Sequence, residues 1–166
     1  MLDKCDSDLV QIDFLEAQKA QHEHDLRNHF DILSLHKVDR LKHYGLHFAK
    51  YVGRLARGNL EEKPYSVTLT DAYLVCLSAA NTLHQRLEHN SSLDQKEFLD
   101  FASSAGRFCD ACEKVDHLEE FVQLARTSNQ EVMEYLISAS SCAGIDVNEL
   151  AKNRRLELRD RHFYIR

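Results

Sequence analysis

The sequence predicts a single all-α domain over residues 1–166, a helical bundle of about five to six helices. Three observations support this prediction: 43% of the 166 residues are hydrophobic, only one residue is proline, and only five are glycine. A β-rich chain of this length needs many more turn residues, because each short strand is followed by a turn. A chain of this length also buries a sizeable core without disulfide or metal support.

The first half of the chain is expected to form an N-terminal helix within 1–33 and a helical hairpin within 34–90. Apolar residues recur at helical spacing between 8 and 28 and again between 35 and 55. Ser34 is the expected N-cap of the second of these helices, and Gly58 its end. Thr70 is the expected N-cap of the next helix, whose stretch 72–80 is apolar on nearly every side. That helix should therefore be the central and most buried one.

The second half is expected to form another hairpin within 91–151 and a basic tail over 152–166. Two capping boxes, Ser92-x-x-Gln95 and Ser128-x-x-Glu131, are expected to open the two helices of this hairpin. Gly144 should end the second of these helices, and Asp146-x-x-Glu149 should open a last basic helix.

A short internal repeat indicates that the two hairpins are related by a pseudo-twofold axis. Residues 48–55 (FAKYVGRL) and 101–108 (FASSAGRF) share phenylalanine, alanine, glycine and arginine at equivalent positions. Asp71 and Glu131 also occupy equivalent places, each 13 residues before a helix end, at His84 and Gly144 respectively.

The charge is uneven along the chain. The formal net charge is −6, but residues 152–166 contain six basic and two acidic residues, so this tail carries +4 and the remainder −10. An acidic body argues against nucleic-acid binding as a general function. The basic tail could contact a phosphorylated small molecule or an acidic neighbouring subunit, or form a solvated helix end.

The chain has no signal-peptide or membrane-spanning pattern, and its five cysteines form no secreted framework, so we expect a cytoplasmic protein. Cys109-x-x-Cys112 has the spacing of half a zinc site, but no second ligand pair accompanies it. Buried core positions are the simpler interpretation of these two cysteines.

Two pairs of acids are the main candidates for chemistry. Asp110-x-x-Glu113 and Glu131-x-x-Glu134 each place two carboxylates on one helical face, with 17 residues between the pairs. If the two helices pack as a hairpin, the four carboxylates can converge as ligands of Mg²⁺ or Mn²⁺. Helix capping and ordinary surface charge are the alternative interpretation of these acids.

This spacing resembles the signature of MazG-like all-α nucleotide pyrophosphohydrolases, Glu-x-x-Glu followed after a comparable gap by Glu-x-x-Asp. The segment from Glu131 to Asp146, which ends in Gly-Ile-Asp, also resembles this family, as does the following Lys-Asn segment. The resemblance implies Mg²⁺-dependent hydrolysis of a nucleoside triphosphate or deoxynucleoside triphosphate to the monophosphate and pyrophosphate. It implies catalytic roles for Glu113 and Glu131, and phosphate contacts from Lys152, Asn153 and Arg155.

The acidic motif departs from the family pattern. The four acids read Asp, Glu, Glu, Glu, and alignment on Gly144 instead makes Glu131 the closing acid and places Ser128 where an acid is expected. In the first hairpin Lys50 and Arg54 stand where acids are expected, which leaves only Asp71. Two hypotheses follow: the second hairpin holds the sole metal site, or the chain is a MazG-like protein that has lost catalysis.

Histidines are concentrated in the first 47 residues. His43 and His47 are four residues apart and could bind a transition metal, and His24-Asp25 resembles the His-Asp pair of HD phosphohydrolases. No further ligands at suitable spacing accompany either pair, so surface or interface histidines are the favoured interpretation.

A non-catalytic helical interaction module is the alternative function. Because two of the expected helices carry wide apolar stripes, we expect a homodimer or a tetramer.

Overall fold

A computed structural model describes residues 12–89 and 95–160, and in these ranges all regular structure is helical. The α-helices are α1 (Phe14–Asn28), α2 (Phe30–Leu33), α3 (Lys37–Arg57), α4 (Tyr65–Thr82), α5 (Phe98–Lys114), α6 (Val122–Cys142) and α7 (Val147–Arg159). Two 3₁₀ turns, Gly58–Leu60 and Val115–His117, follow α3 and α5. The predicted all-α helical bundle is therefore confirmed. None of the described helices is long and apolar enough to cross a bilayer.

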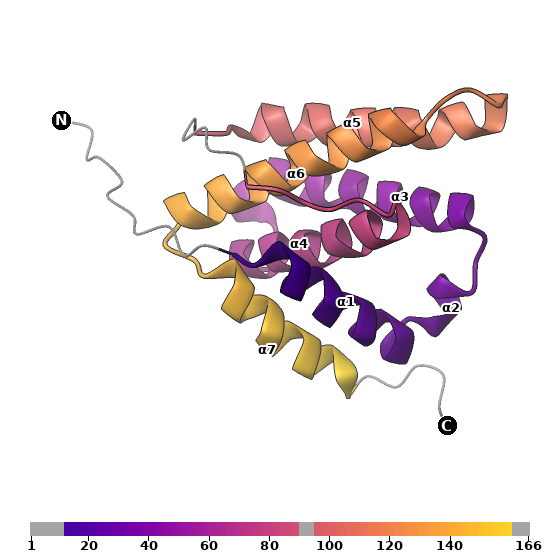
Figure 1. Cartoon of the computed structure of the whole chain (residues 1–166). Helices are drawn as coiled ribbons and strands as arrows, with labels where there is room; N and C mark the ends of the chain where they lie inside the picture. Colours follow the sequence, from indigo (N-terminus) through magenta and orange to yellow (C-terminus); the bar gives the residue numbers. More distant parts are fainter. Residues whose placement is uncertain (1–11, 90–94, 161–166) are drawn as a thin grey trace.

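Helices α3 to α6 form a four-helix bundle, with α3–α4 and α5–α6 as its two hairpins (Figure 1). Helix α3 packs against α5 and helix α4 against α6, so the two hairpins face each other. Helices α1 and α7 lie outside this bundle and pack on α4 and on one another. The first hairpin is thus covered by two helices that have no counterpart on the second.

Helix α4 is the central helix, as predicted. Its residues are buried on nearly every side, among them Leu69, Tyr73 and Leu77, which are fully buried. An apolar surface that runs round the whole helix can be buried only where neighbours surround it, and α1, α3, α6 and α7 provide these neighbours.

Several predicted helix starts are wrong. Helix α3 begins after His36, whose ring accepts the Val38 N–H, and not at Ser34. Thr70 and Ser128 are buried inside α4 and α6, where each hydroxyl donates to the carbonyl four residues earlier. A serine or threonine can satisfy its hydroxyl in this way within a helix, so such residues do not by themselves mark a start.

Two other helix starts bring a correction and a confirmation. Ser92 lies outside the described residues, and α5 starts with a capping box between Glu97 and Asp100. The predicted start of α7 is confirmed, because the Asp146 side chain accepts the Glu149 N–H. The expected basic tail therefore begins inside a helix that starts at Val147.

The internal repeat has a structural counterpart at the ends of α4 and α6. After α4, His84 has φ +50° and the Gln85 N–H donates to the Ala80 carbonyl at 2.9 Å. After α6, Gly144 has φ +64° and the Ile145 N–H donates to the Ser140 carbonyl at 2.8 Å. Both helices thus end in the same left-handed cap, at the positions that the sequence repeat makes equivalent.

Helices α1 and α7 are also joined directly. The Asn28 amide donates to the carbonyls of Leu158 and Arg159, at 3.3 and 3.2 Å. These carbonyls belong to the last turn of α7, where a helix has no internal donors left for them. Asn28 therefore holds the end of α7 beside the end of α1.

Candidate ligand-binding site

Three of the four acids of the predicted metal site have other side-chain partners. Among the described residues, no group of three or more His, Cys, Asp or Glu side chains is arranged to hold a metal ion. Asp110 and Glu113 are exposed on α5, and Glu113 accepts a hydrogen bond from His117 Nε2 at 2.8 Å. Glu134 lies 3.7 Å from the Lys96 ammonium.

Glu131, one of the two acids expected to be catalytic, forms an ion pair with Arg107 and accepts a hydrogen bond from Ser104 Oγ at 3.1 Å. The Arg107 guanidinium, which projects from the facing helix α5, thus binds the Glu131 carboxylate that was expected to bind a metal ion. The expected convergence of Asp110, Glu113, Glu131 and Glu134 on one cation does not occur in this arrangement.

The first hairpin has an equivalent pairing of an arginine with an acid. Asp71 on α4 lies 4.0 Å from Arg54 on α3 and accepts a hydrogen bond from Arg154 Nε on α7 at 2.8 Å. Arg54 and Arg107 are the arginines of the repeated Gly-Arg dipeptide. In both hairpins, therefore, the repeat arginine neutralises the equivalent acid of the following helix.

The three residues expected to hold phosphate lie on α7 and differ in exposure. Lys152 and Asn153 are exposed, and Lys152 lies 3.2 Å from the Glu149 carboxylate on its own helix. Arg155 is half-buried and points toward α1, where it donates to Gln21 Oε1 at 3.5 Å. Burial lowers the pKa of the Arg155 guanidinium. Only Arg155 of these three lies near the cavity described next.

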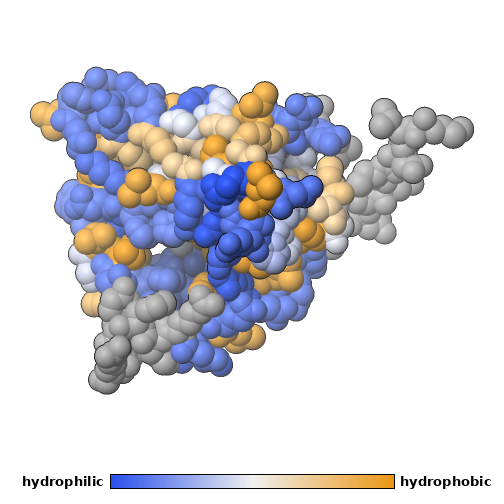
Figure 2. All heavy atoms as spheres, turned by 180° about the vertical axis from the view of Figure 1, so that it is seen from behind, coloured by the Kyte–Doolittle hydropathy of each residue, from blue (hydrophilic) through white to orange (hydrophobic). Residues whose placement is uncertain are grey.

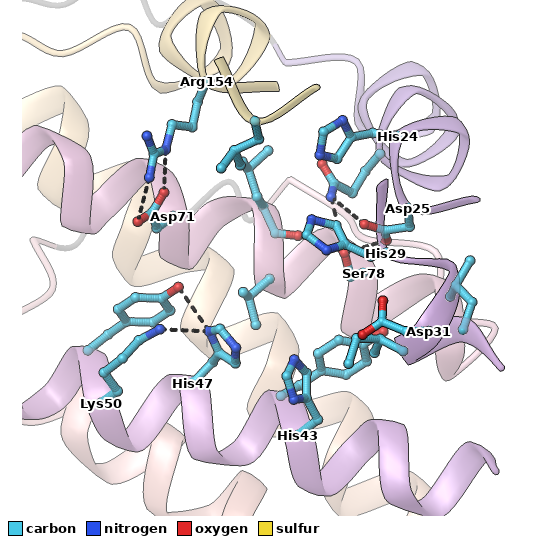
Figure 3. Close-up of a pocket in the computed structure, with 18 residues that line it drawn as sticks. His24, Asp25, His29, Asp31, His43, His47, Lys50, Asp71, Ser78 and Arg154 are labelled. Carbon is cyan, nitrogen blue, oxygen red and sulfur yellow. Dashed lines mark hydrogen bonds and ion pairs between the residues drawn. The ribbon is translucent and has the colours of Figure 1, made fainter. Parts of the chain in front are cut away.

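A cavity of about 330 Å³ lies between α1, α2, α3, α4 and α7. Figure 3 shows side chains from α1, α3, α4 and α7 pointing into the same space. Its polar lining residues are Gln21, His24, Asp25, His29, Asp31, His43, Tyr44, His47, Lys50, Tyr51, Asp71, Ser78 and Arg154. A cavity of this volume lies at the lower end of the range for small-molecule sites.

Four histidines line this cavity. His43 and His47 lie on one face of α3 with ring centroids 4.6 Å apart, and the ring centroids of His24 and His29 are 5.4 Å apart. Burial, reinforced by neighbouring positive charges, lowers the pKa of His24 to about 4 and that of His47 to about 3. Burial also lowers the pKa of His43. The imidazoles of His24, His43 and His47 therefore face the cavity in the neutral form near pH 7.

Lys50 reaches into the cavity without a carboxylate partner. Its ammonium lies 2.9 Å from His47 Nδ1 and 4.6 Å from the centre of the Tyr51 ring, and no salt bridge of Lys50 is found in the part of the chain that the structure describes. The nearby acid, Asp71, is bound by Arg154 and lies beside Arg54. Lysine can only donate, so His47 Nδ1 must accept, and the ring proton of neutral His47 is on Nε2.

The opposite wall holds a buried polar network. Asp25 Oδ2 accepts from Ser78 Oγ at 2.6 Å, and Asp25 Oδ1 accepts from Gln21 Nε2 at 2.9 Å. Burial raises the pKa of the Asp25 carboxyl, although these hydrogen bonds act in the opposite direction. The buried Nε2 of His24 has no hydrogen-bond partner in the described structure. An unpaired buried nitrogen beside a cavity is available to a ligand.

Sequence reasoning identified part of this site. It named His24, Asp25, His43 and His47 but favoured surface or interface positions for the histidines, because no further ligands accompany either pair. It named Lys50 only as a departure from the acidic motif and not as a site residue, although Lys50 lies three residues after His47 on the same helical face. The spacing of His43, His47 and Lys50 was the available signal. Three polar residues at successive turns lie on one face of a helix, and this face could have been recognised as part of a site.

A comparison of the chain with protein-family models, with curated proteins and with solved structures found no match. The MazG-like resemblance therefore stays a prediction that depends on the residues quoted above.

Proposed function

We propose that the chain is a MazG-like helical protein that binds a small phosphorylated molecule in the histidine-lined cavity without a metal ion. The observation that carries this proposal is the position of Lys50, an ammonium that lies in a cavity and contacts an imidazole in place of a carboxylate. A cation in a concave site without an acidic partner favours an anion as ligand.

Neutral groups provide the remaining contacts. The Nε2–H of His47 can donate to a ligand, and the buried His24 Nε2 has no hydrogen-bond partner in the described structure. A phosphate group needs several donors, whereas the organic part of the ligand needs both donors and acceptors. The family resemblance makes a nucleotide the first ligand class to test.

Metal-dependent release of pyrophosphate is not part of this proposal. Mg²⁺ needs free carboxylate oxygens, and the two acids at the repeat positions are each neutralised by an arginine. The expected catalytic roles of Glu113 and Glu131 remain predictions. A nucleotide pyrophosphohydrolase assay with Mg²⁺ and with Mn²⁺ tests them directly.

Thermal unfolding with added ligands tests the binding proposal. Inorganic phosphate, nucleoside monophosphates and nucleoside triphosphates should each be titrated in EDTA and again in Mg²⁺. We expect at least one of them to raise the Tm by mass action, with the same midpoint in both buffers.

Two lysine variants locate the binding. Lys50→Met should abolish the stabilisation, whereas Lys152→Met, which removes an exposed lysine on α7, should leave it unchanged. Loss of the effect only in the Lys152 variant would move the site to the originally predicted phosphate contacts. Absence of stabilisation by every compound would leave the non-catalytic interaction module in its place.

Assembly into a homodimer or tetramer is a separate prediction. The apolar stripes of α3 and α5 that motivated it pack against each other within the chain. On the face seen in Figure 2, hydrophobic side chains appear as patches between hydrophilic ones. Light scattering at micromolar concentration measures the assembly directly. The cytoplasmic location likewise stays a prediction.

A further inference from the structure

We propose that the cavity takes up a proton from solvent together with its anionic ligand, so that Lys50 and protonated His47 together form the receptor for a dianion. This inference rests on the proposed function and adds the charge state of the ligand and the pH dependence of its binding. The protein contributes one positive charge before binding and two afterwards.

The contacts of His47 within the cavity keep its ring neutral. Lys50 Nζ lies 2.9 Å from His47 Nδ1, and the Tyr51 hydroxyl lies 3.2 Å from the same nitrogen. Protonation of Nδ1 would place a second positive charge against the ammonium and remove the acceptor of this hydrogen bond. The Lys50–His47 contact is therefore compatible only with the neutral ring.

An anion in the cavity reverses this preference. The Lys50 side chain can turn from His47 to the anion, because a charge-assisted hydrogen bond to a negative oxygen is stronger than one to a neutral imidazole. His47 Nδ1 then loses its donor and can accept a proton. The protonated ring is attracted by the anion. This attraction outweighs the repulsion between the ring and the Lys50 ammonium, which is now farther away.

The charged and titratable groups around His47 come from each element that forms the cavity. Helix α3 contributes His43, Lys50, Tyr51 and Arg54, helix α1 contributes His24 and Asp25, and His29 follows α1. Helix α2 contributes Asp31, helix α4 contributes Asp71, and helix α7 contributes Arg154. Asp71 is paired with arginines, and Asp25 bonds Ser78 and Gln21.

Those pairings determine which group responds to the ligand. Burial and then Lys50 are the two largest causes that lower the pKa of His47 to about 3. Movement of Lys50 toward an anion weakens the second cause, and the negative charge of the anion raises the pKa of His47 against the effect of burial. His47 is thus the ring whose protonation is most directly controlled by the position of Lys50.

The charge balance selects the ligand class. A receptor with two positive charges matches a dianion, such as a phosphomonoester or inorganic phosphate above its second pKa. A monocarboxylate requires only Lys50 and gives no reason for proton uptake. The shared chemistry is a tetrahedral dianion, whether it is a free ion or the end group of a sugar phosphate or nucleotide.

Calorimetric titration with sulfate measures the proton uptake without interference from the ligand. Sulfate stays a dianion over the whole range between about pH 5 and pH 8, so any proton that is taken up must bind to the protein. Titrations in two buffers of different ionisation enthalpy should give different heats, from which the number of protons per ion follows. We expect the protein to take up as much as one proton per bound sulfate. The affinity for sulfate should then fall by up to about tenfold for each unit by which the pH is raised. Acetate should show neither effect.

His47→Gln is the matched variant, and His117→Gln, which alters an exposed histidine after α5, is its control. His47→Gln should still bind sulfate, but more weakly at low pH and without buffer-dependent heat. His117→Gln should behave as the unaltered protein. A thermal melt of each variant establishes that it is folded, and the two-buffer experiment on the unaltered protein needs no variant.

The outcomes separate the two proposals. Sulfate or phosphate binding with equal heats in the two buffers overturns the proton uptake and leaves the proposed function intact. Proton uptake that persists in His47→Gln overturns the assignment to His47. If sulfate, phosphate and nucleotides all fail to bind, both the proposed function and this inference are wrong.

Discussion

The two hairpins share a local design but differ in what covers them. In the second hairpin, the ion pair of Arg107 and Glu131 lies at the surface, with side chains 46% and 31% exposed. In the first hairpin, Asp71 is only 16% exposed, and Arg54 and Arg154 are 17% and 14% exposed. Helices α1 and α7 produce this difference, because they pack on the first hairpin alone. The cavity thus arises from the helices that are not repeated.

The largest effect should be the same in both hairpins. Phe48 and Phe101 begin the two repeats, and both are fully buried. Phe48 packs edge-on against Phe108, with ring centroids 5.0 Å apart, and Phe101 stacks on Tyr135 at 4.9 Å. Phe48→Ala and Phe101→Ala should each lower the free energy of unfolding by about 4 kcal/mol. Urea unfolding of the two variants measures this, and a difference of more than about 2 kcal/mol would contradict an equivalent core.

Asp71→Asn should distinguish the hairpins. It leaves two largely buried guanidinium groups without their carboxylate, so we expect a loss of about 3 kcal/mol in the free energy of unfolding. The amide keeps the shape of the side chain, and urea unfolding measures the loss. A loss below about 1 kcal/mol would show that water reaches Arg54 and Arg154 as easily as it reaches Arg107.

Acid should weaken the first hairpin more than the second. The folded-state pKa values of His24 and His47, about 4 and about 3, lie below the ordinary 6.5, so the unfolded chain binds more protons between these values. Stability should therefore fall as the pH is lowered from 6.5 toward 4. Asp25, whose pKa is raised by burial, acts in the opposite sense above its ordinary 3.8. Helices α5 and α6 and the turn between them contain only the exposed His117.

Thermal unfolding between pH 7 and pH 5 measures this effect, and we expect a fall of several degrees in Tm. The His24→Asn/His47→Gln double variant should show a smaller fall, because these side chains no longer take up protons on unfolding. An unchanged pH dependence in the double variant would assign the acid sensitivity to other groups.

Glu131→Gln should have the smallest effect. The pair with Arg107 is open to solvent, so its removal should change the free energy of unfolding by less than about 1 kcal/mol. Any Mg²⁺-induced rise in Tm of the unaltered protein that disappears in this variant would support the predicted metal site. A urea melt and a Mg²⁺ titration together provide both measurements.

The fold was largely predictable because hydrophobic spacing and the scarcity of turn residues are local properties of the sequence. The repeat was also predictable, down to the equivalence of His84 and Gly144, because a left-handed cap imposes a backbone geometry that recurs. The helix starts predicted at Ser34, Thr70 and Ser128 were wrong. A serine or threonine whose hydroxyl donates to a carbonyl of its own helix cannot be told from a capping residue in the sequence.

The site was harder to predict, because its residues come from five helices. Arg154 lies 83 residues from Asp71, and Ser78 lies 53 residues from Asp25. The sequence identified acids that are near one another along the chain. It could not show that arginines would neutralise them or that histidines from α1 and α3 would face the same space.

The hydrogen bonds from Asn28 to the end of α7 span 130 and 131 residues of sequence. Contacts so distant along the chain form late in folding, because closing a long loop costs entropy before other contacts repay it. The two hairpins, with their local contacts, should assemble first, and α1 and α7 should dock onto α4 afterwards. Native-state hydrogen exchange should therefore show α1 and α7 opening together, at a lower free energy than α4. The cavity walls that α1 and α7 form would then open as one unit, while the walls formed by α3 and α4 stay folded in the bundle.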